Sequence, residues 1–318
     1  MRRRPKVEGE LEPTNHHQTM SNHRQLHVEQ LPNQDLYAHL ATAIAPRPIC
    51  FASTVDAAGR VNLSPYSFFN VFSSNPPVLV FSPVRSGRDG STKDTLDNVR
   101  ATQEVVINVV DFSMVEQMSL ASTAYPKGVN EFEKAGFTEA PSAGVRPPRV
   151  AESPVSFECT VDRVLPLGEE GGAGNLVLAR VQTIHIREDL LGEDGKILPQ
   201  RLDLVGRMGG NAYVRASGAA LFEVKKPTRQ HGIGVDRLPE GVRNSNVLTG
   251  NDLGKLGGLP ELPTEADLIA LRADPEIMPL LRQPTTREVW HRYAQTLMGA
   301  GDTARALRVL TLAEVVVR

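Results

Sequence analysis

Short runs of β-branched and aromatic residues, separated by turn residues, fill the chain from about residue 47 to residue 186. The run at residues 49–55 is followed by a turn at 56–60 and a second run at 61–64, a pattern that predicts a β-hairpin. Many antiparallel strands with few helices predict a mostly β fold with short helices, a barrel or sandwich rather than a doubly wound parallel sheet. Further strands are expected at 78–82, 105–110, 155–165 and 176–186, and short helices at 95–102 and 112–121.

The two ends of the chain differ from this β-rich part. Residues 1–28 have almost no apolar periodicity and predict a flexible tail. We therefore expect a β domain at 29–220 and a C-terminal extension at 221–318. Within the extension, seven glycines between residues 232 and 258 predict a long irregular segment, either a wrap over a partner subunit or a lid over a site.

Helical spacing returns near the C-terminus. Trp290, Ala294 and Leu297 recur on one face, glycines follow at 299 and 301, and Asp302 is a suitable cap for a second helix. This pattern predicts a helical hairpin with an apolar face that needs cover, which favours the wrap.

Composition and charge narrow the function classes. The chain has 318 residues and 40% hydrophobic residues, and a formal charge of −2 gives no indication of nucleic acid or an anionic membrane as partner. No apolar run approaches 18 residues and no apolar signal core follows the basic N-terminus, so we expect a cytoplasmic protein. Cys50 and Cys159 are predicted to be buried, in keeping with a reducing compartment. No metal site is expected.

Two segments carry candidate chemistry. Residues 62–70 combine aromatic side chains with hydroxyls and amides, a mixture suited to a planar heterocycle, although Phe51, Phe72 and Phe81 are expected simply to fill a core. Downstream, Lys93 stands where a helix begins, and the free N–H groups of a helix start favour a phosphate. Asp94 is expected to cap this helix, and Arg85 and Arg88 to lie in a basic surface loop. No G-x-G-x-x-G motif and no phosphate loop of the correct spacing is present.

Ordered sequence blocks between about residues 35 and 216 resemble the flavin reductase-like, FMN-binding split-barrel family. The blocks include Ala45-Pro46-Arg47-Pro48, residues 62–70, Ser74-Asn75-Pro76-Pro77, Lys93-Asp94-Thr95-Leu96, Pro147-Pro148-Arg149-Val150 and Arg207-x-Gly209-Gly210-x-x-Tyr213. The resemblance implies a split β-barrel that forms a homodimer with one FMN per subunit. It also implies a set of cofactor-binding residues: Arg47, Ser53, Thr54, Ser64, Pro65, Tyr66, Ser67, Phe69, Asn70, Ser82, Lys93, Thr95 and Arg207.

Three of the candidate features, a histidine, an arginine and a pair of glycines, have two interpretations each. His185 falls where similar proteins place a histidine near the flavin, which makes it the candidate catalytic residue for nicotinamide contact; the alternative is a rim histidine with a hydrogen bond only. Arg47 either stabilises a reduced flavin or forms a salt bridge across the barrel. Gly209 and Gly210 either allow close backbone approach to the ring or serve a turn.

The resemblance implies an FMN-binding oxidoreductase, an NADH- or NADPH-dependent flavin reductase in which hydride passes to flavin N5. Reduced flavin would then reach a monooxygenase or another electron acceptor. The alternatives are a non-catalytic or electron-transfer FMN flavoprotein that works with a protein partner, and a barrel that binds another ligand. No sequence motif distinguishes NADH from NADPH.

Overall fold

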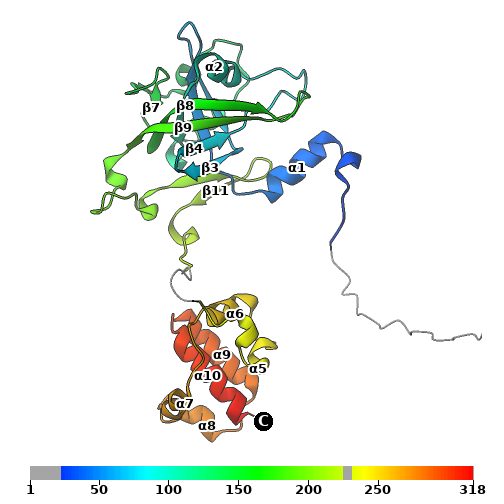
Figure 1. Cartoon of the computed structure of the whole chain (residues 1–318), viewed down its shortest axis with the longest axis vertical. Helices are drawn as coiled ribbons and strands as arrows, with labels where there is room; N and C mark the ends of the chain where they lie inside the picture. Colours follow the sequence, from blue (N-terminus) through cyan, green and yellow to red (C-terminus); the bar gives the residue numbers. More distant parts are fainter. Residues whose placement is uncertain (1–22, 225–230, 318) are drawn as a thin grey trace, which may run out of the picture. The chain divides into compact units, whose positions relative to one another are not determined.

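The structure is a computed structural model that describes residues 23–224 and 231–317. The chain divides into two compact units, residues 1–222 and 223–318 (Figure 1). Most of the predicted N-terminal tail lies outside the described residues, and residues 23–28 are exposed. Within the described parts of the chain, every helix is too short or too polar to cross a membrane.

The first unit is built on a seven-stranded antiparallel sheet in the order β2-β1-β5-β8-β9-β4-β3 (Figure 1). The two edge strands, β2 and β3, are consecutive in sequence and joined by Ser67 and Phe68 alone. Because two residues span only about 10 Å, the sheet must curl until its edges approach, as in a split barrel. The strands are β1 (Cys50–Val55), β2 (Val61–Tyr66), β3 (Phe69–Ser74), β4 (Pro77–Phe81), β5 (Glu104–Val109), β8 (Val155–Pro166) and β9 (Asn175–Ile186).

The predicted hairpin and four further strands are confirmed, with Val55 opposite Val61 across the first turn. Side chains of β1 alternate between two cores, as the two-residue period of a strand requires. Cys50 and Ala52 enter the barrel interior, whereas Phe51 packs against the helices outside it. Both cysteines are free and buried, as predicted.

Of the three phenylalanines expected to fill a core, two are buried and one is not. Phe51 and Phe81 are fully buried, as expected, but the same expectation was wrong for Phe72, which is 70% exposed. The reason is that β3 is an edge strand whose outer side chains have no second layer over them among the described residues.

Short helices and two small hairpins surround the sheet. Helices α2 (Asp94–Thr102) and α3 (Val115–Leu120, after the 3-10 turn Phe112–Met114) agree with the predicted helices. The sequence patterns missed α1 (Asn33–Ala43), the strand β3 and the hairpin β10–β11. The remaining elements of this unit are α4 (Glu131–Ala135), β6 (Glu139–Ala140), β7 (Arg149–Val150), β10 (Leu204–Arg207), β11 (Tyr213–Ala216) and 3-10 turns at Val28–Gln30, Glu188–Leu190, Pro199–Arg201 and Gly218–Ala220.

The second unit is helical and has its own core around Trp290 and Leu310. The predicted hairpin is present as α9 (Arg287–Gly299) and α10 (Thr303–Val316), and the Asp302 side chain caps α10 by accepting from Arg305 N. The other elements are a 3-10 turn at Val235–Arg237, α5 (Glu240–Arg243), α6 (Gly250–Gly257), α7 (Glu265–Arg272) and α8 (Met278–Arg282).

The expectation of an irregular segment at residues 232–258 was wrong. It contains α5 and α6, and α6 begins with a capping box between Thr249 and Asp252, which compensates for its glycines. Val242 and Leu256 are fully buried in the core of the unit. The segment thus covers the apolar face of its own hairpin, and the reason for expecting a wrap over a partner subunit disappears.

Leu256→Ala is expected to destabilise the second unit by about 2–5 kcal/mol, because it opens a cavity in the core that also contains Trp290. Trp290 is the one tryptophan of the chain, so its fluorescence reports unfolding of this unit during a urea titration. Ile107→Ala, in the core of the first unit, is the matched control. It should shift the β-sheet circular dichroism transition and leave the tryptophan transition in place; a shift of the latter would contradict separate cores.

Candidate functional site

A buried polar cluster ties the first turns of α2 to the hairpin β1–β2. Asn62 Nδ2 donates to Thr95 Oγ1 at 2.8 Å, and Asn98 Nδ2 donates to Thr54 Oγ1 at 3.0 Å. All four side chains are buried. Because a buried amide is costly to leave unpaired, these bonds hold the start of α2 against the hairpin that carries the Ser64–Asn70 ribbon.

The ribbon itself alternates between buried and open positions. Ser64, Pro65, Ser67 and Phe69 are half-buried, and Asn70 is exposed. Asn70 Oδ1 accepts from Val71 N at 2.8 Å, which leaves its amide NH₂ as a donor at the surface.

Tyr66 points inward from the ribbon. Burial raises the pKa of Tyr66 to about 12, and the nearby Thr95 and Ser64 hydroxyls oppose that shift. The phenol is therefore protonated at neutral pH. Its hydroxyl and that of Ser53 are buried without a hydrogen-bond partner in the described parts of the chain. Such groups are rare in folded proteins.

Lys93 stands at the start of α2 with an exposed side chain, and its carbonyl accepts from Leu96 N and Asp97 N. The expectation that Asp94 caps this helix was wrong. Lys93 is the N-cap residue and no side chain caps the helix, since Asp94 Oδ2 instead accepts from Gly128 N at 3.4 Å. The start of α2 thus has no side-chain cap from its N-cap residue, Lys93.

Arg85 supports the loop that leads into α2. It is half-buried rather than a surface residue, and its Nη1 donates to Gly90 O at 3.0 Å. Its Nε is buried without a partner among the described residues. Sequence reasoning missed this role, because nothing in a single arginine before a glycine-rich loop distinguishes a brace from a surface charge. Arg88 is exposed, as expected.

Ser82 and Thr54 are less open to a ligand than their predicted roles suggest. Ser82 is buried, and its Oγ accepts from Asn175 N at 3.1 Å. Thr54 is fully buried and accepts from Asn98, and Ser53 and Thr95 are fully buried as well. These residues lie beneath the ribbon and the start of α2, so their contribution to a site is mainly to hold its walls.

Arg47 is a buried brace. Its guanidinium donates to the carbonyls of Ala41, Ile44 and Met208 and, at 3.3 Å, to Ser67 Oγ. Because carbonyls and a hydroxyl rather than carboxylates receive these bonds, the second of the two interpretations, a salt bridge across the barrel, is wrong. Arg47 ties α1 and the turn after β10 to the link between β2 and β3.

Arg207 pairs with Arg47 through the backbone, and its guanidinium lies 4.6 Å from the centre of the Tyr213 ring. The side chains of Arg207 and Tyr213 line a pocket of about 530 Å³ beside the hairpin β10–β11. Gly210, with φ of 58°, forms the turn of that hairpin, and a Cβ on Gly209 would clash with Thr42 of α1. The two glycines therefore serve a turn and a helix contact.

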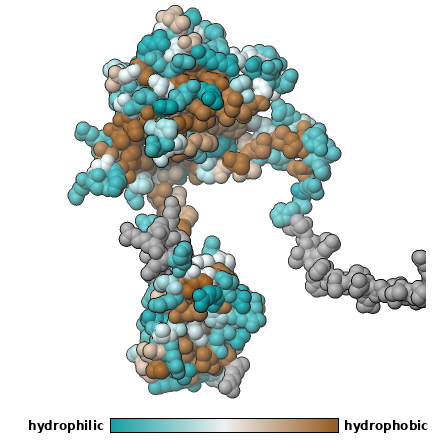
Figure 2. Space-filling view, viewed as in Figure 1, coloured by the Kyte–Doolittle hydropathy of each residue, from teal (hydrophilic) through white to brown (hydrophobic). Residues whose placement is uncertain are grey.

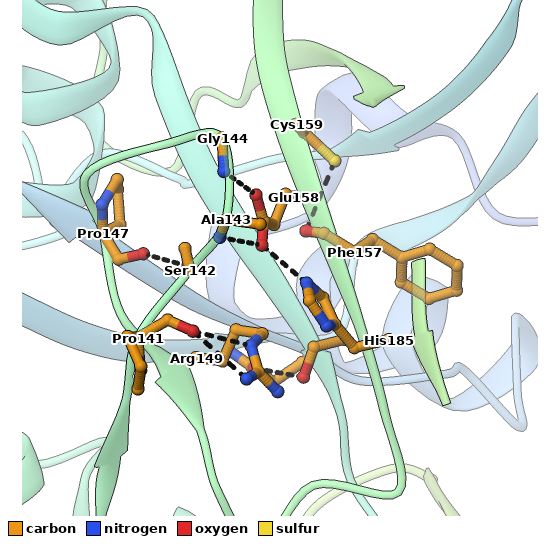
Figure 3. Close-up of polar contacts among 12 residues, drawn as sticks. Pro141, Ser142, Ala143, Gly144, Pro147, Arg149, Phe157, Glu158, Cys159 and His185 are labelled. Atoms are coloured by element: carbon orange, nitrogen blue, oxygen red, sulfur yellow. Dashed lines mark hydrogen bonds and ion pairs between the residues drawn. The ribbon is translucent and has the colours of Figure 1, made fainter. Parts of the chain in front are cut away.

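His185, on β9, is anchored by Glu158 of the neighbouring strand β8 (Figure 3). The two atoms Nε2 and Oε1 lie 2.6 Å apart, and the Glu158 carboxylate also accepts from Ala143 N and Gly144 N, each at 2.7 Å. Burial by itself raises the pKa of Glu158, but the two backbone N–H groups and His185 outweigh it and lower that pKa below its usual value. Glu158 is thus an ionised acceptor, and Nε2 of His185 donates to it.

This geometry leaves Nδ1 as the free nitrogen of the His185 ring, whose side chain is 28% exposed. A carboxylate that fixes one ring nitrogen sets the orientation and tautomer of the other. Sequence reasoning singled out His185 but missed Glu158, since the two residues are 27 positions apart and become neighbours only through strand pairing.

Comparison with known proteins agrees with the fold. A split barrel domain structure from Shewanella frigidimarina NCIMB 400 matches with a TM-score of 0.53 at 23% identity, covering 62% of this chain and 96% of that one. The first unit is a split barrel of this kind. Residues 42–202 match the family model of the flavin reductase like domain, and the chain belongs to that family.

Proteins that match about the same share of this chain support its membership of the family. An uncharacterized protein of Halalkalibacterium halodurans is 38% identical over 205 residues, which is 64% of this chain and 96% of the relative. Nitrilotriacetate monooxygenase component B from Bacillus cereus matches with a TM-score of 0.60 at 30% identity, covering 64% and 98%. The 2-nitrobenzoate 2-nitroreductase NbaA of Pseudomonas fluorescens matches with a TM-score of 0.57 at 25% identity, covering 66% and 100%. The chain is accordingly a flavin-related oxidoreductase.

The residues at the start of α2 and along the ribbon fit a flavin. The half-buried side chains of Ser64 and Ser67 and the exposed amide of Asn70 offer hydrogen-bond groups to a ring edge. Lys93 and the uncapped start of α2 offer charge and N–H groups to an anionic tail. The bond between Asn62 and Thr95 keeps both sets together.

Glu158→Gln is expected to lower the free energy of unfolding at pH 7 by about 1–3 kcal/mol, because the buried network loses its charge and one of its two acceptor oxygens. The lowered pKa gives the sign of the pH effect. The stabilisation is fully present above the ordinary glutamate pKa of 4.5 and is lost as the pH falls through the lower value of the folded state. Urea titrations of both proteins between pH 7 and pH 3 should therefore converge at acid pH.

Glu104→Gln is the control for this prediction. Glu104 pairs with the exposed Arg146 at 2.7 Å, and exposed ion pairs contribute little to stability. An unchanged gap between wild type and Glu158→Gln at every pH would contradict the assignment.

Proposed function

We propose that this protein is an FMN-binding oxidoreductase, an NADH- or NADPH-dependent flavin reductase in which hydride passes to the flavin N5. The main supporting observation is that β2, the strand that continues into the ribbon, meets the start of α2 through the 2.8 Å bond between Asn62 and Thr95. Membership of the flavin reductase-like family supports a flavin as the ligand of the site between the ribbon and the start of α2.

The chain's own residues would divide the binding of FMN between two ends. Ser64, Pro65, Ser67, Phe69 and Asn70 would hold the ring. Lys93 and the N–H groups of α2 would hold the phosphate, because a helix start favours an anion. The remaining predicted residues would support these walls from below or beside them: Arg47, Ser53, Thr54, Tyr66, Ser82, Thr95 and Arg207.

When bound, FMN supplies the ring that accepts hydride from a reduced nicotinamide. The protein's part is to orient the two rings and exclude water, which requires no acid or base of its own. His185 would position the nicotinamide through Nδ1, the nitrogen that Glu158 leaves free.

Two partners follow as proposals. The outer side chains of the edge strand β3 and of α1 are hydrophobic and exposed, including Val71, Phe72, Leu40 and Ile44. Figure 2 shows hydrophobic residues over one face of the first unit and along α1. Apolar patches of this kind mark protein interfaces, which supports a homodimer. The similarity to component B of a monooxygenase supports an oxygenase as the acceptor of reduced flavin.

Lys93→Ala is expected to weaken FMN binding by about tenfold or more, the loss of one charge-assisted contact to phosphate. Riboflavin, which has no phosphate, should bind both proteins alike. Quenching of flavin fluorescence during titration measures both constants. Lys134→Ala, an exposed lysine on α4, is the control and should bind both flavins as the wild type does. Equal loss of FMN and riboflavin affinity would place the phosphate elsewhere.

Anaerobic addition of NADH or NADPH to the FMN-loaded protein should bleach the flavin absorbance. His185→Asn is expected to raise the KM for the nicotinamide by about tenfold with little change in reduction by dithionite, since only the nicotinamide contact is lost. His39→Asn, on the exposed face of α1, is the control. Bleaching by dithionite but by neither nicotinamide would contradict the reductase and favour the electron-transfer flavoprotein.

A further inference from the structure

The second unit contains a polar pocket of about 390 Å³, formed where α5 and the residues after it pack on α9 and α10. Three carboxylates line it, those of Glu240, Glu288 and Glu314, against one guanidinium, that of Arg287. The volume is in the range of small-molecule sites. The wall charge is therefore negative, provided that the histidine in the wall, His291, is neutral.

The hydrogen bonds of Ser245 determine the protonation of His291. Ser245 Oγ accepts from Val247 N and from Leu248 N, both at 3.0 Å, which uses its two lone pairs. Its single proton is thus directed to His291 Nδ1, 2.7 Å away. Nδ1 is an acceptor, so the ring is neutral and its proton is on Nε2.

The burial of His291 also favours a neutral ring. The residue is 3% exposed, and burial lowers its pKa, as does Arg287, while Glu314 opposes the shift. Nε2–H of His291 is buried without a hydrogen-bond partner among the described residues. An unsatisfied buried donor destabilises the fold, which calls for a group that satisfies it.

Glu314 presents the complementary unsatisfied atom. Its Oε1 is also buried without a hydrogen bond within the described residues, and its nearest cation is Arg287, whose Nε lies 3.4 Å away. That side chain is 49% exposed, and ion pairs of this kind are weak. A Cβ on Gly241 would clash with the Glu314 carboxylate, so the glycine leaves the space in which the carboxylate lies.

A metal ion does not fit this arrangement. Across the described ranges, nowhere do three or more His, Cys, Asp or Glu side chains gather in a group able to hold one. Among the described residues that line the pocket, the unsatisfied buried atoms are one donor, Nε2–H of His291, and one acceptor, Oε1 of Glu314. The wall around them is acidic, and its guanidinium is only loosely paired.

We infer that this pocket binds a small organic cation, a primary amine with an oxygen acceptor on a neighbouring carbon. The ammonium group displaces Arg287 as the counter-ion of Glu314, and the oxygen accepts from Nε2–H of His291. The wall then has both of its unsatisfied atoms paired, and the ligand charge balances the surplus of carboxylates. This site is in the C-terminal extension, within the second unit.

L-lysinamide is a suitable probe, because its ammonium groups match the wall charge and its amide oxygen neighbours the α-ammonium. Isothermal titration of the full chain at low salt should give a Kd of about 1 mM or tighter. The doubly N-acetylated form, which is neutral, should not bind. Glu314→Gln should weaken binding by about tenfold or more, whereas Arg287→Gln should strengthen it, since the competing cation is gone.

Glu265→Gln, an exposed carboxylate on α7, is the matched control and should bind the probe as the wild type does. Nitrogen NMR of the His291 ring provides a second readout, with the Nε2–H tautomer expected before the titration and a shift of that proton on binding. No saturable binding, equal binding of the acetylated form, or weaker binding by Arg287→Gln would overturn the inference.

Discussion

The link of two residues between β2 and β3 is the constraint on which the first unit depends. Ser67 and Phe68 join strands at opposite edges of one seven-stranded sheet, so the sheet has to curl and bring its edges together. Arg47 stabilises this link from below, through Ser67 and three backbone carbonyls. The open side chains of the ribbon lie on either side of the link, and the proposed flavin site is therefore a direct result of closing the barrel.

Buried polar contacts place the chemistry on this scaffold. Asn62 and Asn98 bind the start of α2 to the hairpin, and Glu158 holds His185 from the neighbouring strand. In each case an amide or carboxylate inside the protein has partners that come from distant parts of the chain. Since such groups are costly to leave unpaired, they hold the local geometry more strictly than apolar packing alone, and they fix the walls of the proposed flavin site.

In the second unit, helix caps and buried apolar side chains fix the fold, and two buried polar atoms in one pocket stay unpaired within the part of the chain that the structure describes. Its glycine-rich segment folds because Thr249 forms a capping box and because Val242 and Leu256 enter the core that contains Trp290. Glycine content alone suggested an irregular segment, since propensity is a weak predictor where caps and burial act together. Among the buried side-chain atoms without a partner in the described residues, those of His291 and Glu314 share the wall of one pocket, and this is why they point to a ligand.

Local patterns in the sequence were sufficient for the strands β1, β2, β4, β5, β8 and β9, for α2 and for the C-terminal hairpin, because hydrophobic period and caps act over a few residues. The ordered motifs were sufficient for the family. They did not reveal that Phe72 is exposed, that Asp94 leaves the cap to Lys93, that Arg47 binds carbonyls, or that Glu158 holds His185. Edge position, strand register and long-range hydrogen bonds decide these features, and each depends on residues that only the folded chain brings together.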